Sequence, residues 1–503
     1  MTAVTEIMQA TVRPHRRSKR PPMWPISKVA AAAALVAAAA GCTASGDAIG
    51  PRPDELFFPT GAAVSPDGQF VFVANSNSDL TYDSGTVAAL SVARLESAIV
   101  PWLTAGTIPA EDCVDEELDD NHEQTGPCCA QNSDFTETLV CDEGLFLPEP
   151  DRPRAGEPEG SRLKGVRIGN FATEVALQDL LDGRLRLIVP TRGDPAIAWV
   201  DWDPEQQRLS CSEGNKEFDL CDSPHRLSFV HNDTDLPSIP EEPFGAFADS
   251  AGQFAMVTHL TTGSVTLIDS PRDGNAQVAD VQVGVFVADT TTGLRGSTGV
   301  AGRTPKAPGD IVYVGSRSED RIQTFTVGRL VNNAPPVLLQ GDFFFVDGVG
   351  NNANSNSNGS DTRGMAFSAS GNRLFLVNRK PPSLQIYDTS LGPTGAPRNE
   401  LVGVVDVCRQ ASTVTVAGLG DSERAYVTCF QDGQVYVIDP RGTGRVEDII
   451  SAGRGPYAAV AAPDGKWLYV TNFLEDTMSV IDLRPGSLTR YRVVLRVGKP
   501  RTP

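Results

Sequence analysis

The chain has 503 residues, a formal net charge of −20 and 21% charged residues. Residues 1–41 contain six Lys or Arg and one Glu, so the remainder carries 37 basic and 62 acidic side chains, a net charge of about −25. A surface this acidic repels phosphate backbones and anionic membranes, which argues against a nucleic-acid partner. Glycine and proline are plentiful, as many short strands and turns require, and no useful helical periodicity is expected after residue 57.

The N-terminus contains a short apolar run at residues 29–40, directly behind Lys28. Twelve residues are too few to span a bilayer as a stable helix. A positive flank, a short apolar core and small residues at the end of the core are typical of a secretory signal. The compact segment that starts at Met23 has the ordinary length of such a signal, so we expect Met23 to be the true start.

The apolar run ends in Ala39-Ala40-Gly41-Cys42, which resembles a bacterial lipobox. The resemblance implies a signal peptide over residues 1–41, a lipidated Cys42 and a flexible tether over 42–56. Thr43 stands where an aspartate would indicate inner-membrane retention, so the resemblance favours export and anchoring to the outer membrane, on its periplasmic or surface side. The alternatives are ordinary signal cleavage, or an Ala-rich helix followed by a chance cysteine.

The C-terminal stretch Gly453–Leu483 has the pattern of consecutive antiparallel strands: aromatic and β-branched residues at period two, separated by turn residues. The pattern recurs along the chain. The residues that end the second strand of each copy, which we call marker residues, are Asn75, Thr191, His259, Ser316, Asn378, Cys429 and Asn472. The last spacing, 43 residues, is that of a four-stranded propeller blade, and the longer spacings imply inserted loops.

Seven copies at this spacing predict an all-β fold, a closed seven-bladed β-propeller of four-stranded antiparallel blades over residues 57–503. A cysteine-rich acidic insert occupies about residues 103–163 of the first blade, whose outer strand resumes at Leu163–Ile168. The outer strand of blade two is predicted at Arg226–Val230. The marker residues are expected on one face of the ring, and the insert and the Cys211–Cys221 loop on the other.

Tyr469-Val470-Thr471-Asn472 resembles the signature of the bacterial YVTN β-propeller repeat family, with a variant at Tyr426–Cys429. The resemblance covers about residues 57–497 and implies the fold. Members of that family are often secreted or cell-surface proteins, and lactonase-type enzymes have a similar propeller. No catalytic set of residues carries over from the resemblance.

Eight cysteines besides Cys42 favour disulfides in an exported chain, although sequence alone allows about 105 pairings. Cys211 and Cys221 bracket one loop and are expected to pair. Cys408 and Cys429 fall on the same predicted face, which favours a bridge at the entry to blade six. The four cysteines of the insert are expected to pair among themselves: Cys113, Cys128, Cys129 and Cys141. Metal binding is the less favoured alternative, because the spacing is unlike that of zinc ligands.

Few residues suggest chemistry. Arginines directly follow three marker residues and form a candidate anion-binding ring over the channel: Arg192, Arg317 and Arg379. His259 is a further ligand candidate, although a lone histidine is more often a hydrogen-bonded blade residue. Aspartates recur at the ends of third strands and fit turn capping better than an acid pair: Asp269, Asp388, Asp439 and Asp482. No metal site or cofactor is expected, and the acidic cluster at 111–120 lacks the spacing of a calcium loop.

Two functions compete, since the propeller fold supports both binding and catalysis. The first is a monomeric, lipid-anchored propeller of the cell envelope that binds a protein or glycan partner without catalysis. The alternative is a lactonase-like hydrolase, or another periplasmic enzyme, with its site at the channel mouth. The alternative would require His, Glu and Arg side chains that converge at that mouth.

Overall fold

The computed structural model divides the chain into two compact units, 1–48 and 49–503, and describes only parts of the second. The predictions for Met23, Cys42, Cys113 and the 111–120 cluster therefore lie outside the described residues. Within the second unit those residues are 49–51, 55–109, 128–148, 165–212, 220–249, 253–286, 296–303, 311–328, 334–346 and 361–498.

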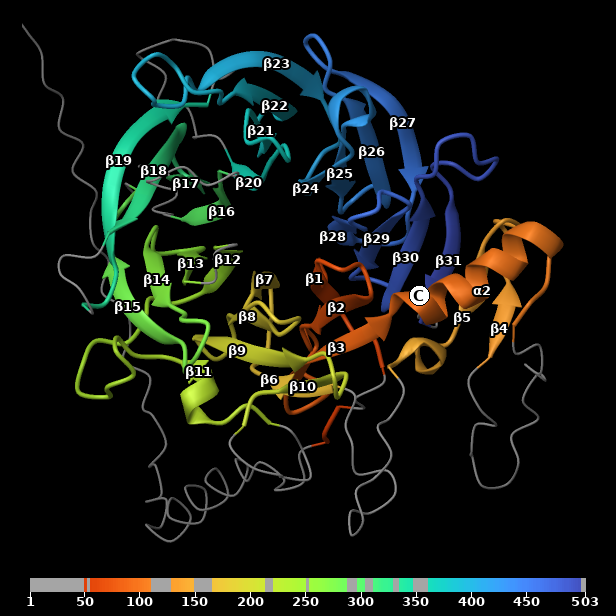
Figure 1. Ribbon diagram of the computed structural model, residues 1–503, viewed down its shortest axis with the longest axis horizontal. Coiled ribbons are helices and arrows are strands. Elements are labelled where there is room, and N and C mark those ends of the chain that lie inside the picture. Colours follow the sequence, from red (N-terminus) through yellow and green to blue (C-terminus); the bar gives the residue numbers. More distant parts are fainter. Residues whose placement is uncertain are drawn as a thin grey trace, which may run out of the picture. The chain divides into compact units, whose positions relative to one another are not determined.

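Seven sheets stand around a common centre, which confirms the predicted seven-bladed β-propeller (Figure 1). Each blade adds its strands from the inside outward, and the blades follow one another in chain order. The strands of blades one to three are β1 (Pro59–Val64), β2 (Phe70–Asn75), β3 (Gly85–Ser91) and β6 (Gly165–Ile168); β7 (Ala176–Asp179), β8 (Leu185–Thr191), β9 (Ala196–Asp203), β10 (Arg208–Ser210) and β11 (Arg226–Leu227); and β12 (Pro243–Ala248), β13 (Phe254–His259), β14 (Val265–Asp269) and β15 (Gln277–Gln282).

Blades four to seven each contain four sequential strands. They are β16 (Ser297–Gly302), β17 (Ile311–Ser316), β18 (Arg321–Gly328) and β19 (Val337–Phe345); β20 (Thr362–Phe367), β21 (Arg373–Arg379), β22 (Pro382–Asp388) and β23 (Glu400–Asp406); β24 (Ala411–Ala417), β25 (Arg424–Cys429), β26 (Gln434–Asp439) and β27 (Arg445–Ser451); and β28 (Pro456–Ala461), β29 (Trp467–Asn472), β30 (Thr477–Asp482) and β31 (Val493–Val497). The predicted strands and these strands agree to within a few residues at most ends.

Blade two departs from the prediction at its outer edge. The expected single strand Arg226–Val230 is a two-residue strand, β11, and a second short strand, β10, also pairs with β9. The Cys211–Cys221 disulfide closes the loop that joins β10 to β11. The outer position of this blade is therefore divided between two short segments, because the intervening loop leaves too little regular sequence for one strand.

The blades pack face to face through apolar side chains that alternate along the strands. Seven buried hydrophobic clusters lie at the junctions between neighbouring blades. The core is thus a ring of inter-blade layers, and no single blade could bury its faces alone.

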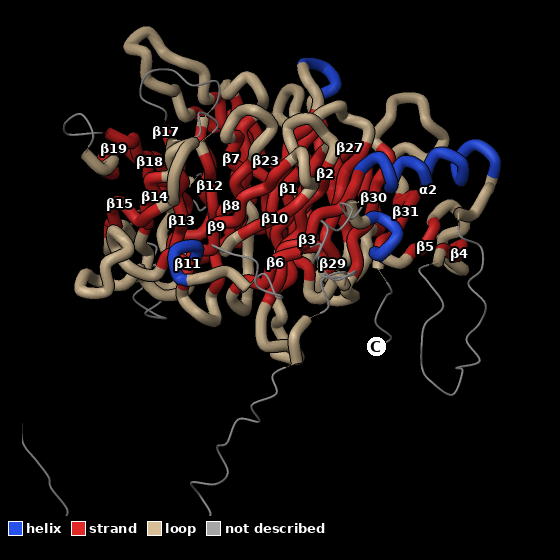
Figure 2. The backbone as a smooth tube through the Cα atoms, turned by 60° about the horizontal axis from the view of Figure 1, so that its bottom comes forward, coloured by secondary structure: helices blue, strands red, loops and turns tan. Residues whose placement is uncertain are grey.

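The insert of blade one forms a clasp across the junction between the first and last blades. We use this name for α2 (Val92–Ala105), the 3₁₀ turn η2 (Glu143–Phe146), β5 (Leu139–Cys141) and β4 (Cys129–Gln131). Strand β5 pairs in parallel with β31, the outer strand of blade seven, and β4 pairs with β5, so blade seven has six strands. Figure 2 shows α2 at the rim of the ring, beside β31 and β5.

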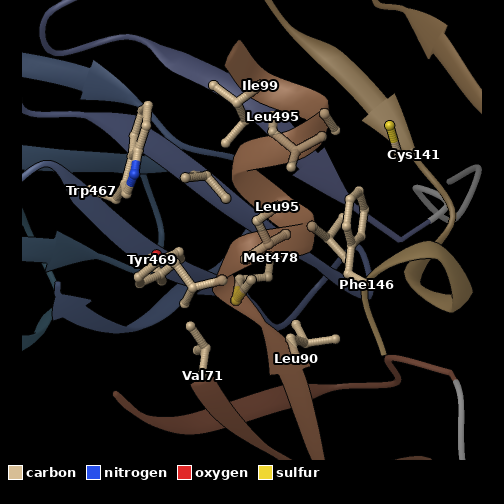
Figure 3. Close-up of a cluster of buried hydrophobic side chains, with 14 of the residues drawn as sticks. Val71, Leu90, Leu95, Ile99, Cys141, Phe146, Trp467, Tyr469, Met478 and Leu495 are labelled. Carbon is tan, nitrogen blue, oxygen red and sulfur yellow. The ribbon is translucent and has the colours of Figure 1, made fainter. Parts of the chain in front are cut away.

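Helix α2 contributes its apolar face to the cluster between blades one and seven. Leu95 and Ile99 are buried there against Trp467, Tyr469 and Met478 (Figure 3). The indole Nε1 of Trp467 donates a hydrogen bond to Glu96 Oε1 at 2.9 Å.

The clasp corrects two predictions. A 14-residue helix exists where no helix was expected, and the described part of the insert lies on the rim of the ring instead of on one face. The buried residues of α2 are Val92, Leu95, Ala98 and Ile99, a helical spacing that Pro101 obscures because a proline normally ends a helix. No helix among the described residues has the length and hydropathy needed to cross a bilayer.

Candidate functional site

A cavity of about 670 Å³ occupies the centre of the ring, lined by the first strands of the blades and by the segments that precede them. The first strands share one geometry. Their first residue lies opposite the marker residue, and the register shifts before the fourth residue. The second and third residues of these strands are thereby released from regular pairing, and in blades three to seven they line the cavity.

The threonine of the Tyr-Val-Thr-Asn signature joins neighbouring blades at this irregularity. In blade seven, Thr471 Oγ1 accepts a hydrogen bond from Ala458 N at 3.0 Å and donates one to Thr60 O of blade one at 2.7 Å. Thr428 Oγ1 makes the equivalent bond to Tyr457 O, and Thr258 Oγ1 to Thr298 O. Thr60 and Thr298 donate to the next blade from the second position of the first strand. In blade two the corresponding residues precede β7: Ala172 forms an isolated bridge with the marker residue Thr191, and Thr173, which follows it, donates to Phe244 O of the next blade.

Arg379 makes the corresponding link between blades five and six. Its Nε donates to Ala411 O at 2.7 Å, and its Nη2 donates to Ser412 Oγ at 3.3 Å. Burial, together with the charge of Arg363, lowers the pKa of Arg379 to about 10. This predicted anion ligand therefore also fastens two blades together. Its partners among the described residues are neutral groups, so its positive charge is not neutralised by a hydrogen-bonded carboxylate.

The residue at the third position of the first strand has a small side chain or none in most blades, because a neighbouring blade approaches it closely. Four blades have glycine there: Gly61, Gly245, Gly299 and Gly364. A Cβ added to Gly61 would lie 2.4 Å from the backbone of blade two, and one on Gly245 would lie 2.3 Å from Thr298 O. Thr413 and Ala458 occupy the equivalent positions of blades six and seven. Glu174, in blade two, is the exception.

Glu174 therefore places a carboxyl group in the channel where packing alone requires almost no side chain. Burial raises its pKa to about 7, although a hydrogen bond from Val175 N to Glu174 Oε1, at 3.2 Å, opposes that shift. A carboxyl group with this pKa changes its protonation state near neutral pH.

Two more arginines line the cavity, Arg192 and Arg363, and both pair with carboxylates. Arg192 Nη2 lies 2.5 Å from Glu242 Oε1, and Arg363 Nε lies 2.8 Å from Asp361 Oδ1. The Nε of Arg192 has no hydrogen-bond partner among the described residues. Arg317 is not among the residues that line the cavity, but burial and the charge of Arg363 lower its pKa, while Asp361 and Glu242 oppose the change. The four guanidinium groups of this cluster thus have only two carboxylates as ion-pair partners.

Tyr457 lies within the electrostatic influence of this cluster. Burial and the charge of Glu174 raise its pKa to about 12, and Arg363, Arg192 and Arg379 oppose the shift. The tyrosine occupies the second position of β28 and lines the cavity. Its hydroxyl group therefore stays protonated and is available as a hydrogen-bond donor in the channel.

His259 is part of the blade and does not line the cavity. It is fully buried; its Nδ1 lies 3.1 Å from Glu241 O, and its Nε2 lies 2.8 Å from Thr266 Oγ1. Because the Glu241 carbonyl can only accept, Nδ1 donates to it and Nε2 accepts from the threonine hydroxyl group. Burial lowers the pKa of His259 to about 4, so the ring is neutral. The structure favours the interpretation of a hydrogen-bonded blade residue.

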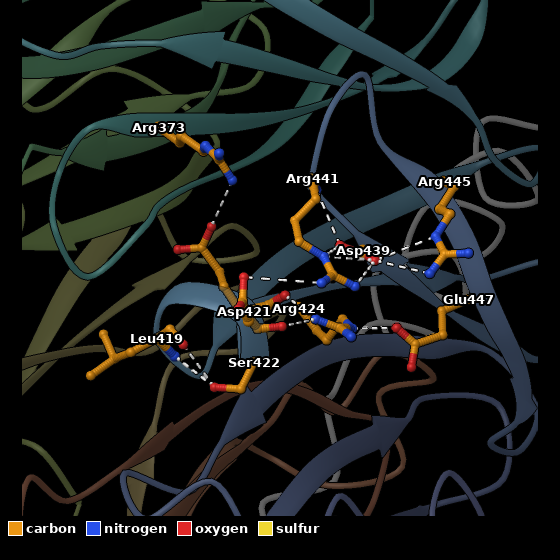
Figure 4. A network of polar contacts seen from close by, with 10 residues as sticks. Arg373, Leu419, Asp421, Ser422, Arg424, Asp439, Arg441, Arg445 and Glu447 are labelled. Atoms are coloured by element: carbon orange, nitrogen blue, oxygen red, sulfur yellow. Dashed lines mark hydrogen bonds and ion pairs between the residues drawn. The ribbon is translucent and has the colours of Figure 1, made fainter.

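The recurring aspartates also have a structural role, as expected. Asp388, Asp439 and Asp482 each accept a hydrogen bond from the backbone N–H two residues ahead, which caps the turn after the third strand. Figure 4 shows Asp439 between Arg441 and Arg445. The hydrogen bonds from Arg441 hold the pKa of Asp439 well below its usual range. These carboxylates serve turns and are not paired with one another.

Two predicted disulfides are confirmed, Cys211–Cys221 and Cys408–Cys429. Within the insert, Cys129 pairs with Cys141, and Cys128 is also disulfide-bonded. Among the described residues, no group of three or more His, Cys, Asp or Glu side chains is arranged to hold a metal ion.

Sequence reasoning found three of the four arginines but missed Glu174, Arg363 and Tyr457. The signal that identifies them is an alignment of the seven first strands from their marker-paired residue. Hydroxyl and glycine residues dominate the second and third positions, so a glutamate, an arginine or a tyrosine there stands out against its six equivalents. Comparing only the ends of the second strands does not reveal this.

No protein-family model matches the sequence, and no curated protein matches it. Solved structures with a similar fold include the periplasmic gluconolactonase of Pseudomonas aeruginosa, with 16% identity over 69% of this chain and 90% of that one and a TM-score of 0.48. A protein from Lactobacillus plantarum has 15% identity, 67% and 89% coverage and a TM-score of 0.47. Kuenenia stuttgartiensis hydrazine synthase has 12% identity, 87% and 98% coverage and a TM-score of 0.47. These likenesses concern the propeller fold, and no function is carried over from them.

Proposed function

We propose that this protein is a binding propeller whose central channel takes up a small organic anion. The observation that carries the proposal is the excess of guanidinium over carboxyl groups in and around the channel. Arg192, Arg363 and Arg379 line the cavity, and Arg317 interacts electrostatically with them. The carboxyl groups are Glu242, Asp361 and Glu174, and the last of these has a pKa of about 7. In a chain with a net charge of −20, this local positive charge is the reverse of the surrounding surface. An anion entering the channel would meet attraction only there.

The chemistry of the cluster suits a carboxylate or phosphate group. Guanidinium groups bind such groups through paired, charge-assisted hydrogen bonds, and partial burial strengthens those bonds. Arg192 offers an unpaired Nε, and Arg379 is bonded only to neutral groups, so both retain capacity for an anion. The hydroxyl group of Tyr457 would add a neutral donor.

The cellular setting is part of the same proposal. The lipobox-like sequence at Cys42 supports a lipid-anchored protein of the cell envelope, and the resemblance to the YVTN repeat family supports export. The disulfides agree with an oxidising compartment. A protein or glycan partner, the occupant expected from the sequence, would be compatible with the channel if it presented an acidic group.

The decisive experiment removes an ion pair without changing the net charge. We expect R192Q/E242Q to weaken binding of gluconate, acetate or inorganic phosphate at least tenfold by calorimetry, because a direct ligand is lost while the local charge stays the same. The matched control is R184Q/D273N, an exposed ion pair of the same type that does not line the cavity. Equal anion affinity in wild type and R192Q/E242Q, or no binding by wild type, would reject the proposal.

A second candidate function, a lactonase-like hydrolase, is favoured by one observation: a carboxyl group with a pKa of about 7 lines the same cavity as Arg192, Arg363 and Arg379. As a carboxylate, Glu174 could accept a proton from a water that attacks an ester carbonyl carbon, while a guanidinium stabilises the oxyanion. The ester C–O bond would then break, and the leaving oxygen would take the proton back. Glu174 and three arginines line the same cavity, whereas His259 does not. Turnover of a lactone by wild type, abolished in E174Q, would favour this function over binding alone.

A further inference from the structure

The channel mouth is divided into a basic part and an aromatic part. The residues that directly follow the seven markers are Ser76, Arg192, Leu260, Arg317, Arg379, Phe430 and Phe473. Arginines occupy this position in blades two, four and five, and phenylalanines occupy it in blades six and seven. Arg379 and Phe430 lie at equivalent positions on adjacent blades, and both line the cavity.

Four aromatic rings form a continuous row on the apolar side. The ring centroids of Phe430 and Phe473 are 5.8 Å apart, those of Tyr457 and Phe473 are 6.2 Å apart, and those of Phe430 and Tyr457 are 6.5 Å apart. Phe58 extends the row into blade one, 5.3 Å from Phe473. Phe430 and Tyr457 line the cavity, Phe473 contacts both of them, and Phe58 contacts Phe473.

The row is held in place at a cost to the backbone. Phe58 has a positive φ of 45°, a conformation that a bulky side chain rarely adopts. A hydrogen bond from Phe58 N to Asp476 Oδ1, at 2.6 Å, and one from Ser76 N to Phe58 O, at 3.1 Å, fix this conformation. Strain that the surroundings enforce in this way is commonly found at ligand sites.

The aromatic row is not fully covered by the protein. All four rings remain half-buried, whereas most large apolar side chains of the blades are fully buried. Aromatic faces left open in a cavity next to guanidinium groups suit a ligand that carries a flat apolar ring and an anionic group.

We propose that the anion bound in the channel is an aromatic carboxylate, with its ring against Phe430 and Tyr457 and its carboxylate on Arg379 and Arg192. The inference rests on the proposed anion-binding function and makes it more specific. Arg363, whose guanidinium carbon lies 6.0 Å from the ring centre of Phe244, is already paired with Asp361 and adds charge without being required as a direct ligand.

Three small probes separate the parts of this inference: phenylacetate has a ring and a carboxylate, acetate has only the carboxylate, and benzyl alcohol has only the ring. We expect phenylacetate to bind wild type at least tenfold more tightly than either of the others, as measured by calorimetry. F430L keeps apolar volume but removes the ring, and it should weaken phenylacetate binding several-fold while leaving acetate binding unchanged. The matched control is F345L, a 62% exposed phenylalanine on β19.

The outcomes distinguish this inference from the function on which it rests. If acetate or gluconate binds in a manner that depends on Arg192, but phenylacetate binds no more tightly, the aromatic ligand is rejected and the anion-binding channel stands. If no anion binds, both fail. Equal loss of phenylacetate affinity in F430L and F345L would also overturn the aromatic contact.

Discussion

Glu174 shows how a repeated architecture reveals a candidate functional residue. The equivalent side chain is absent in four other blades, where a Cβ would collide with the neighbouring blade. Glu174 therefore does nothing for ring closure that glycine does not do, and its carboxyl group is buried at the expense of its charged form. Comparison of the same position in the seven blades of one chain therefore shows which side chain the packing requires and which it does not.

The ionisation of Glu174 should make stability depend on pH. Its pKa is raised from 4.5 to about 7 in the folded state, so the folded protein binds this proton more tightly than the unfolded chain does. Stability is therefore lost as the pH rises between about 4.5 and 7. E174Q mimics the neutral acid, and we expect it to match wild type at pH 4.5 and to be more stable by about 1–3 kcal/mol at pH 8.

Urea denaturation at both pH values measures this difference. The control is E205Q, at an exposed glutamate, which should shift stability by no more than about 0.5 kcal/mol at either pH. If the stability difference between E174Q and wild type were the same at both pH values, the raised pKa assigned to Glu174 in the folded state would be wrong.

At the scale of the strand, the Thr of the Tyr-Val-Thr-Asn signature has a physical explanation. The hydroxyl group of Thr471 satisfies a backbone N–H freed by the irregular first strand and also bonds to the next blade. The Asn that follows bonds to loop and strand groups, including Thr477 Oγ1 and Ser479 Oγ. The signature is therefore a device for joining blades and carries no catalytic information.

Removal of that hydroxyl group should destabilise the ring. T471V keeps the shape of the side chain but leaves Ala458 N and Thr60 O without their partner, which costs about 1–3 kcal/mol. Thermal unfolding should show the loss, whereas T136V, at an exposed position in the loop between β4 and β5, should be nearly neutral. A T471V variant as stable as wild type would show that these bonds are replaced by water.

Sequence periodicity located the strands well because apolar and polar residues alternate along each half-buried strand, and turn-forming residues separate one strand from the next. It failed at α2, where Pro101 interrupts a helix that tertiary packing stabilises, and at β10, a three-residue strand too short to show a period. The site was predicted in part. Arginines at loop positions are visible in a repeat, whereas Glu174 becomes conspicuous only when the register of the first strands is known.

For the whole molecule, the clasp determines how the ring is closed. The parallel pairing of β5 with β31 joins Leu139 to Leu495, and Thr138 Oγ1 donates to Val493 O at 2.6 Å. No local pattern predicts a partner hundreds of residues away, and the clasp strands are only three residues long. Its position was therefore inaccessible to sequence reasoning.

Leu95 tests the contribution of the clasp to stability. The side chain is 1% exposed between blades one and seven, so L95A should cost about 2–5 kcal/mol through lost burial and the cavity left behind. L488A, at a fully exposed leucine, is the control and should change the free energy of unfolding by less than about 0.5 kcal/mol. A loss in L95A no larger than in L488A would mean that α2 packs without stabilising the ring.

The clasp also has a consequence for the order of folding. During synthesis or export, α2 and β5 emerge early, but the strand that covers them, β31, is the last of the described strands, and its Val493 lies 355 residues beyond Thr138. Until β31 arrives, a sheet edge and an apolar helix face have no native partner, and such surfaces favour aggregation. Contacts so distant in sequence form slowly. The first blade therefore cannot complete its packing until the seventh blade has formed. Deletion of β31 should make the protein less soluble, because α2 and β5 near the beginning of the chain would stay exposed.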